Sequence, residues 1–406
     1  MSRRFVLAAV VLGCAFAAVR VGASSPAALP SPPFKVDFLP GWQAEHIAFA
    51  QGSSGRPVGG PARWAVGGVL PLAAYPAEHA DRLYSPDSDV RVYFSDQRRR
   101  IWLLEKGEVW PIAGADDLGE TDGPGPFASF IYTGVYGGHH DGMVASGYTV
   151  YVLDNSRLRR IQRQADGSWL VATVAGAGRR TLRPGEQASL EELGPLGKGL
   201  AIDAAGNIFF PLAGGIVRAT PEGRVSWLIT ADRVMADMAD VYRRKWPDAP
   251  VPKFVLGSGE GVELTAHRNG DLYGGGRTFP PAWKVTRDGR FVPLVGYAPK
   301  DRLLRDRRWG EGDPALYEPH CPMGFSVTPE GYVTIQNEIP FAKSRYEENR
   351  VSVLTKDGTW GLLPADSKDF LRIPQGMEMR MDGVLEGNAP GPFHSRTAWI
   401  RLRRMP

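Results

Sequence analysis

Five residues of the sequence stand directly before a glycine at the start of a β-rich run. They are Asp141, Lys198, Glu260, Met323 and Gln375. Carboxylate and amide oxygens are the ligands that calcium and other hard cations prefer. We therefore expect Asp141, Glu260 and Gln375 to bind a divalent metal, with calcium as the first choice. Lys198 would supply a positive charge that balances the carboxylates, or would orient a carbonyl or carboxylate group of a ligand.

Histidines supply a second kind of chemistry in the same loops. His139, His140 and His320 precede β-rich runs, and an imidazole can act as a general base near neutral pH or bind zinc. We expect His140 to activate water and His139 to contact the substrate, with His320 as another catalytic candidate. The alternative for each histidine is a hydrogen-bonded loop residue, and zinc is the alternative metal.

Three further residues are candidates for substrate binding. Arg277 lies in a Gly-rich loop, where it would hold an anionic ligand, and Tyr136 and Trp309 belong to a set of aromatic residues in long loops. Long loops on a rigid scaffold are where binding residues concentrate. The expected partner is a small molecule, a glycan or a peptide.

An internal repeat predicts the scaffold that positions these residues. Each unit has four β-rich runs, and the glycines of the third turn lie 60, 56, 66 and 69 residues apart, at Gly107, Gly167, Gly223, Gly289 and Gly358. Asp-Gly between alternating apolar residues indicates a hairpin. Four antiparallel strands per repeat are typical of β-propeller blades. We predict an all-β fold, a six-bladed β-propeller formed by residues 34–406 as one domain.

The last repeat lacks a fourth β-rich run after residues 398–402. Residues 34–39 alternate apolar and polar side chains, which is the pattern of a strand. We expect this N-terminal strand to complete the last blade and close the ring.

One segment has a helical pattern. In residues 231–246, Val234, Met238 and Val241 recur at helical spacing, which predicts a short amphipathic helix. It would cover hydrophobic surface or, alternatively, serve as a lid.

The first 23 residues have the features of a cleavable signal peptide. Arg3 and Arg4 precede an apolar run that Arg20 ends, and the paired arginines resemble a twin-arginine signal. The run is too short for a membrane anchor. Residues 24–33 form a flexible leader in this interpretation, and the protein is periplasmic or secreted.

Charge gives no reason to expect nucleic acid as a partner. The formal charge is +4 for the full sequence, and most of it belongs to the three arginines of the signal segment. No Lys/Arg stripe dominates any segment of the remainder. Cys321 is the single cysteine after residue 23, so we expect a fold without an internal disulfide.

Several motifs resemble the NHL repeat family. Residues 119–123 and 127–130 are similar to its linker, and Asp154-Asn155-Ser156-Arg157-Leu158-Arg159 resembles its acid-Asn-Arg strand end. The resemblance implies a β-propeller and a structural, hydrogen-bonding role for Asp154. It does not imply one function, because functions vary widely on this fold.

A second resemblance is to the regucalcin/gluconolactonase family of six-bladed propellers. Glu260-Gly261 resembles its Glu-Gly motif, and His140-Asp141-Gly142 stands where Asn-Asp-Gly is expected. This implies metal ligands before the glycines and a metal-dependent hydrolase of the lactonase type. A non-catalytic ligand- or protein-binding propeller is the alternative. A His-ligated metal lyase, similar to the peptidyl-amidoglycolate lyases, is the third possibility.

Overall fold

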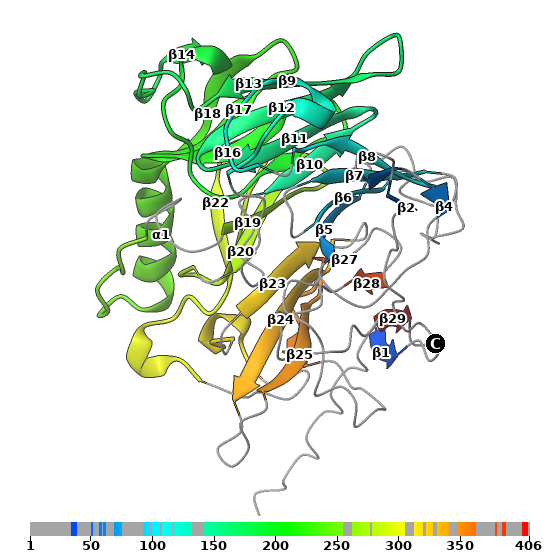
Figure 1. The fold of residues 1–406 in the computed structure, drawn as a ribbon. Coiled ribbons are helices and arrows are strands. Elements are labelled where there is room, and N and C mark those ends of the chain that lie inside the picture. Colours follow the sequence, from blue (N-terminus) through cyan, green and yellow to red (C-terminus); the bar gives the residue numbers. More distant parts are fainter. Residues whose placement is uncertain are drawn as a thin grey trace, which may run out of the picture.

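The computed structural model describes most of the chain from residue 92 to residue 362 and shorter pieces on either side (Figure 1). The described residues are 34–38, 50–51, 57–58, 60–61, 69–74, 92–96, 100–105, 108–115, 117–131, 142–254, 262–276, 278–304, 312–319, 322–327, 331–340, 347–362, 378–379, 384–386 and 400–404.

Six antiparallel sheets of four or five strands form most of the described structure. The first contains β4 (Gly60–Pro61), β5 (Val69–Ala74), β6 (Val92–Asp96), β7 (Ile101–Glu105) and β8 (Glu108–Ala113). The second contains β9 (Gly123–Pro124), β10 (Met143–Ser146), β11 (Thr149–Asp154), β12 (Arg157–Arg163) and β13 (Trp169–Ala175). The third contains β14 (Gln187–Ser189), β15 (Ala201–Ile202), β16 (Ile208–Leu212), β17 (Gly215–Ala219) and β18 (Arg224–Thr230).

The remaining three sheets have four strands each. The fourth contains β19 (Val262–Ala266), β20 (Leu272–Gly276), β21 (Ala282–Val285) and β22 (Phe291–Val295). The fifth contains β23 (Pro322–Val327), β24 (Val333–Pro340), β25 (Glu347–Leu354) and β26 (Trp360–Leu362). The sixth contains β27 (Glu378–Met379), β28 (Val384–Glu386), β29 (Ile400–Arg404) and β1 (Phe34–Phe38), while β2 (Ala50–Gln51) and β3 (Pro57–Val58) form a separate pair.

Tight turns connect the strands where the repeat predicted them. The turn glycines Gly167, Gly223, Gly289 and Gly358 all have φ between 79° and 86°, a conformation that glycine adopts without steric cost. Each turn is closed by a backbone hydrogen bond, for example from Thr286 N–H to the Arg290 carbonyl at 2.9 Å. These predictions are confirmed, and the fifth turn, at Gly107, lies outside the described residues.

One edge strand of each sheet lies beside the corresponding edge strand of the next sheet. β5 contacts β10, β10 contacts β15, β15 contacts β19, β19 contacts β23, and β23 contacts β27. In Figure 1 the sheets spread outward from this central series of strands. Sheets that share a centre in this way are arranged like the blades of a β-propeller. We call β5, β10, β15, β19, β23 and β27 the inner strands.

The hydrophobic core lies between neighbouring sheets. One buried cluster joins the first and second sheets, another the second and third, another the third and fourth, and another the fourth and fifth. Strand β16 is buried along its whole length, as expected for a strand with an apolar sheet on each face. The relative positions of the sheets are therefore fixed by side-chain packing.

Three connections between successive sheets share two structural features. The segments 114–130, 176–193 and 296–317 each begin with a glycine whose N–H bonds the carbonyl of Gly125, Leu193 or Pro314. Each also contains a short 3-10 helix, η2 (Gly125–Phe127), η3 (Leu190–Glu192) or η5 (Pro314–Leu316), and the third has η4 (Lys300–Arg302) as well. β9 and β14 belong to the first two segments, which explains why the second and third sheets have five strands and not the expected four.

The connection between the third and fourth sheets contains helix α1 (Ala231–Lys245). Thr230 caps it by accepting a hydrogen bond from the Arg233 N–H, and Val234, Met238 and Tyr242 are buried. The helix packs against β18 of the third sheet and against β22, the edge strand of the fourth sheet. The amphipathic helix is confirmed, and it covers hydrophobic surface at the outside of the sheets. No described helix has the length and apolar character needed to cross a membrane.

The C-terminal end of α1 is held by polar contacts. Tyr242 donates a hydrogen bond of 2.7 Å to the Tyr297 carbonyl, and Lys245 donates to the Tyr297 hydroxyl and to Asp313, both at 2.9 Å. Burial raises the pKa of Tyr242 to about 12. Burial lowers the pKa of Lys245, but the bonds to Tyr297 and Asp313 outweigh it, so the net change is upward. Both changes favour the protonated forms of these groups in the folded protein.

Candidate functional site

The site predicted from the sequence is at the end of the sheets where the inner strands begin, here called the rim. Lys198 is the single predicted site residue within the described part of the chain. The other predicted residues lie outside it: Tyr136, His139, His140, Asp141, Glu260, Arg277, Trp309, His320 and Gln375. The described neighbours of these residues show how the rim is built.

Two glycines bring the starts of neighbouring inner strands into contact. Gly142 has a φ of 112°, and a Cβ atom there would lie 2.7 Å from the Cβ of Leu200. Gly199 has a φ of 110°, and its Cβ would lie 2.4 Å from the carbonyl oxygen of Val262, the first residue of β19. Both positions require glycine. The rim ends of the second, third and fourth sheets therefore touch one another in order.

Lys198 lies next to this contact. The N–H of the preceding residue, Gly197, donates a 3.0 Å hydrogen bond to the Pro211 carbonyl, and Gly199 follows it. The backbone on both sides of Lys198 is thus fixed, whereas its side chain is exposed. A lysine in this position can meet a ligand from solvent.

Residues 132–141 include four of the predicted site residues, and the described residues on either side of them, Ile131 and Gly142, both bond to β11. Before it, the Ile131 N–H donates a 3.0 Å hydrogen bond to Asp154 Oδ1. After it, the Gly142 carbonyl accepts a 2.9 Å hydrogen bond from the Leu153 N–H. Leu153 and Asp154 are consecutive residues, so Ile131 and Gly142 both bond to the rim end of one strand.

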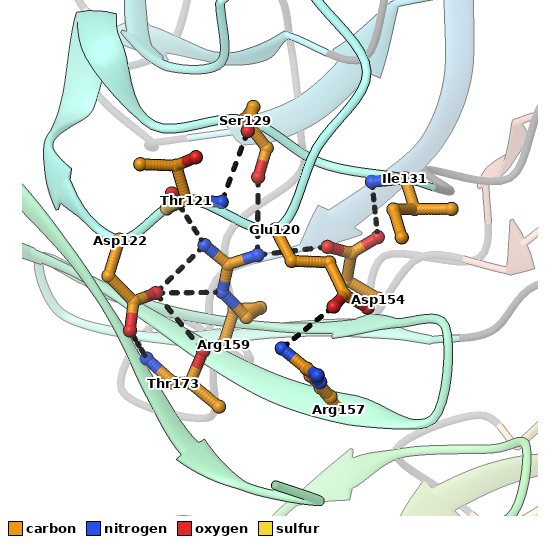
Figure 2. Close-up of polar contacts among 9 residues, drawn as sticks. All are labelled: Glu120, Thr121, Asp122, Ser129, Ile131, Asp154, Arg157, Arg159 and Thr173. Atoms are coloured by element: carbon orange, nitrogen blue, oxygen red, sulfur yellow. Dashed lines mark hydrogen bonds and ion pairs between the residues drawn. The ribbon is translucent and has the colours of Figure 1, made fainter.

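Figure 2 shows that the Asp154 anchor belongs to a network around Arg159. Both side chains are fully buried, and Arg159 Nη1 lies 3.0 Å from Asp154 Oδ2. The guanidinium also bonds the carbonyls of Thr121 and Ser129 and the carboxylate of Asp122. A buried charge is tolerated when it is paired and its donors are satisfied. The structural role expected for Asp154 is therefore observed.

The outer part of the network fixes the connection that precedes the segment. Asp122 accepts hydrogen bonds from Thr173 N–H and Oγ1 at 2.8 and 3.1 Å, and Glu120 pairs with Arg157 at 2.8 Å (Figure 2). These bonds attach residues 120–122 to β12 and β13. The connection that precedes residues 132–141 is thus attached to two strands of the second sheet.

Comparisons with known proteins give similarity of structure only. No protein-family model and no curated protein matches the sequence. Among solved structures, an inactive virginiamycin B lyase from Staphylococcus aureus with quinupristin is similar, at 11% identity and a TM-score of 0.45 over 92% of this chain and 100% of that one. A gluconolactonase from Xanthomonas campestris has 12% identity and a TM-score of 0.40 over 92% and 95% of the two chains.

A calcium-binding regucalcin from Agrobacterium tumefaciens has 12% identity and a TM-score of 0.25, over 64% of this chain and 89% of that one. The last two proteins belong to the group that the rim motifs resemble. Likeness at this level assigns no activity to the chain, and the propeller-like arrangement rests on the sheets and their contacts.

A carboxylate that the sequence analysis did not single out joins two inner strands. Glu263 of β19 accepts a 2.5 Å hydrogen bond from the backbone N–H of Phe325 in β23. An acid in the otherwise apolar start of β19 was the available signal. Its partner lies 62 residues away, so the sequence alone could not identify it.

The described residues contain no group of three or more His, Cys, Asp and Glu side chains that could hold a metal ion. The predicted ligands Asp141, Glu260 and Gln375 are not among them. The metal site therefore stays a prediction, whose donor oxygens fit a hard cation.

Proposed function

We propose that this chain is an exported six-bladed β-propeller whose rim carries a divalent-metal-dependent hydrolase of the lactonase type. Six sheets, five with four consecutive strands and a sixth completed by β1, support the blade number. The pairing of β1 with β29, from Phe34↔Arg404 to Phe38↔Ile400, supports closure by the N-terminal strand. The signal-like residues 1–23 support a periplasmic or secreted location.

The observation that carries the proposal is the contact of the rim glycines. Gly142 packs on Leu200, and Gly199 packs on Val262. Asp141 is bonded to Gly142 and Lys198 to Gly199, so a carboxylate and an ammonium group start from neighbouring points of the rim. A scaffold that brings polar residues of separate repeats together in this way suits a ligand site near the axis.

Each predicted residue has a role in such a site. Asp141, Glu260 and Gln375 would supply oxygen ligands to a calcium-like cation. A cation bound there would polarise the carbonyl group of a lactone or ester. His140 would take the proton of the water molecule that attacks the carbonyl carbon. Lys198 would orient the substrate carbonyl or carboxylate.

The remaining candidates would serve recognition and proton transfer. His139, Tyr136, Arg277 and Trp309 would contact the substrate, and His320 would be a second proton-transfer group. The ligand is then a small molecule, and zinc is the alternative metal.

Metal analysis of the untagged protein tests the proposal. We expect bound calcium in the wild type and its loss in Asp141→Ala and Glu260→Ala, with lactone hydrolysis reduced in Lys198→Ala and His140→Ala. Glu222→Ala is the matched control, because Glu222 is exposed in the turn between β17 and β18, at the opposite end of the sheet from the rim.

Two outcomes would contradict the hydrolase. Absence of calcium and zinc from every preparation would leave a non-catalytic binding propeller. Zinc that is lost in His140→Ala or His320→Ala would instead favour a His-ligated lyase.

A further inference from the structure

The turn between β11 and β12, at the rim end of the second sheet, has an unusual backbone. Asn155 has a φ of 47° and Ser156 a φ of 68°. Within the described part of the chain, these two are the residues other than glycine that have positive φ. A two-residue hairpin turn needs positive φ at both positions and therefore favours Asn-Gly. Asparagine tolerates this conformation, whereas serine adopts it at a steric cost.

The corresponding turn of the third sheet has glycine at the second position. It lies between Leu212 and Gly215, which are paired, and its second residue is Gly214, at a φ of 106°. A glycine in place of Ser156 would thus relieve the strain and keep the turn. A residue that lowers stability where glycine would not is typical of a position whose side chain has a function.

Hydrogen bonds inside the protein do not explain the serine. Neither the carboxamide of Asn155 nor the hydroxyl of Ser156 bonds another group among the residues that the structure describes. Asn155 is exposed and Ser156 is half-buried. Both groups can therefore donate a hydrogen bond to a molecule that arrives from solvent.

The backbone of the turn is held from two sides. The Ser156 carbonyl accepts a 2.9 Å hydrogen bond from the Leu196 N–H. Gly176 packs against the same carbonyl, so that a Cβ atom there would lie 2.3 Å from the oxygen. A strained conformation persists where surrounding contacts determine it in this way. The turn is thus a fixed support for its two side chains.

The bond to Leu196 also places the turn close to Lys198. Lys198 follows Leu196 by two residues, a span of at most about 7 Å, and its side chain is exposed. An ammonium, a carboxamide and a hydroxyl group therefore start from neighbouring points of the rim. All three can donate hydrogen bonds, which suits a ligand group that only accepts them and carries negative charge.

The carboxylates described next to the turn are already paired with arginines. Asp154 is buried and lies 3.0 Å from Arg159, and Glu120 lies 2.8 Å from Arg157 (Figure 2). Their charges are thus balanced by partners within the second sheet, which leaves an anion at the turn with little repulsion from them.

We propose that the Asn155-Ser156 turn and Lys198 bind the carboxylate group of a small-molecule ligand. Asn155 Nδ2 and Ser156 Oγ would donate hydrogen bonds to the carboxylate oxygens, and Lys198 would supply the opposite charge. That this ligand is the substrate rests on the proposed function, and the substrate class is then an ester or lactone that carries a carboxylate. The binding of a carboxylate does not depend on that function.

Ser156→Gly tests whether the serine exchanges stability for binding. We expect the melting temperature to rise by about 1–2 °C, because the relief of strain exceeds the added backbone freedom of glycine in the unfolded chain. The affinity for glutarate should fall about tenfold or more, because a hydrogen bond to a charged group is lost. Gly214→Ser is the matched control, which should lower the melting temperature and leave glutarate binding unchanged.

Asn155→Asp tests the sign of the charge that the turn accepts. Aspartate tolerates positive φ as asparagine does, but its carboxylate would repel glutarate, so the affinity should again fall about tenfold or more. Gln164→Glu makes the same change of charge at an exposed position in the turn after β12, at the opposite end of the sheet, and should have no effect on binding.

Two chromogenic esters distinguish this proposal from the proposed function. Mono(4-nitrophenyl) glutarate carries a carboxylate, and 4-nitrophenyl valerate does not. If the wild type hydrolyses them, Ser156→Gly should raise KM for the glutarate ester and leave KM for the valerate ester unchanged. If it hydrolyses neither, the proposed function fails, and the glutarate titration still decides whether the turn binds a carboxylate. Absence of glutarate binding in the wild type, or equal affinity in Ser156→Gly and Asn155→Asp, would overturn the site.

Discussion

Glu263 and Phe325 connect two sheets through a single short contact, in which the Glu263 carboxylate accepts the Phe325 backbone N–H at 2.5 Å. The bond joins the inner strands β19 and β23, which also contact each other directly. Because the donor is a backbone group, the bond fixes the position of β23 and not merely that of a side chain. It adds a polar link between two sheets that also pack through apolar side chains.

The first prediction concerns this link. Glu263→Ala removes the acceptor and leaves the Phe325 N–H unpaired, which should lower the free energy of unfolding by about 1–3 kcal/mol. Glu263→Gln retains an oxygen that can accept the bond and should cost less. Urea denaturation measures both, and equal stability of the two variants would contradict the role of the bond.

The second prediction concerns Gly275 of β20. A Cβ atom there would lie 2.2 Å from the ring of Phe325, so Gly275→Ala must displace the ring or the strand. Overpacking of this kind costs about 1–3 kcal/mol. Gly194→Ala is the control, because its nearest contact would be an ordinary 3.6 Å. Thermal unfolding should separate the two variants clearly, and similar melting temperatures would argue against tight packing at Gly275.

The third prediction concerns alkaline pH and Tyr242. Its pKa is raised by burial from 10.0 to about 12, so the folded protein keeps a proton that the unfolded chain releases. The resulting stability is complete below pH 10 and is lost as the pH rises toward 12. Tyr242→Phe cannot ionise and should show a flatter decline over this range, although it also loses about 1 kcal/mol with the bond to Tyr297. Stability curves from pH 8 to 12 provide the measurement, and parallel curves would contradict the assignment.

The fourth prediction concerns acid and the turns between third and fourth strands. A side-chain hydrogen bond from Thr286 lowers the pKa of Asp288, one from Thr355 lowers that of Asp357, and one from Ser168 lowers that of Asp166. A lowered pKa means that the stability these groups contribute is present above their usual value of 3.8 and is lost as the pH falls further. Changing all three residues to asparagine should weaken the dependence of the melting temperature on pH below about 4. An unchanged acid transition would show that other groups control it.

The elements predicted correctly from the sequence are those that depend on residues close together in the chain. The turn at Asp288-Gly289 depends on four neighbouring residues and on glycine at positive φ, and α1 depends on the spacing of Val234 and Met238 within one helix. The repeat of such local signals was sufficient to predict antiparallel sheets in a propeller-like arrangement.

Features that join distant residues could not be predicted in the same way. The bond from Ile131 to Asp154 spans 23 residues, and that from Phe325 to Glu263 spans 62. No spacing in the sequence identifies either pair, because each depends on how separate elements pack. The family resemblance did indicate a structural role for Asp154, but it did not indicate that the residue holds the chain leading into residues 132–141.

The pairing of β1 with β29 has a consequence for the order of the chain. Phe34 lies opposite Arg404, so the two ends of the paired strands are as close as those of a hairpin. A loop of about 2–5 residues is enough to join strands in this relation. The sequence could then be opened in an exposed turn, such as the one at Gly223, with every strand keeping its neighbours. Within the sixth sheet, the order in which the strands occur along the chain could thus change without changing which strands pair.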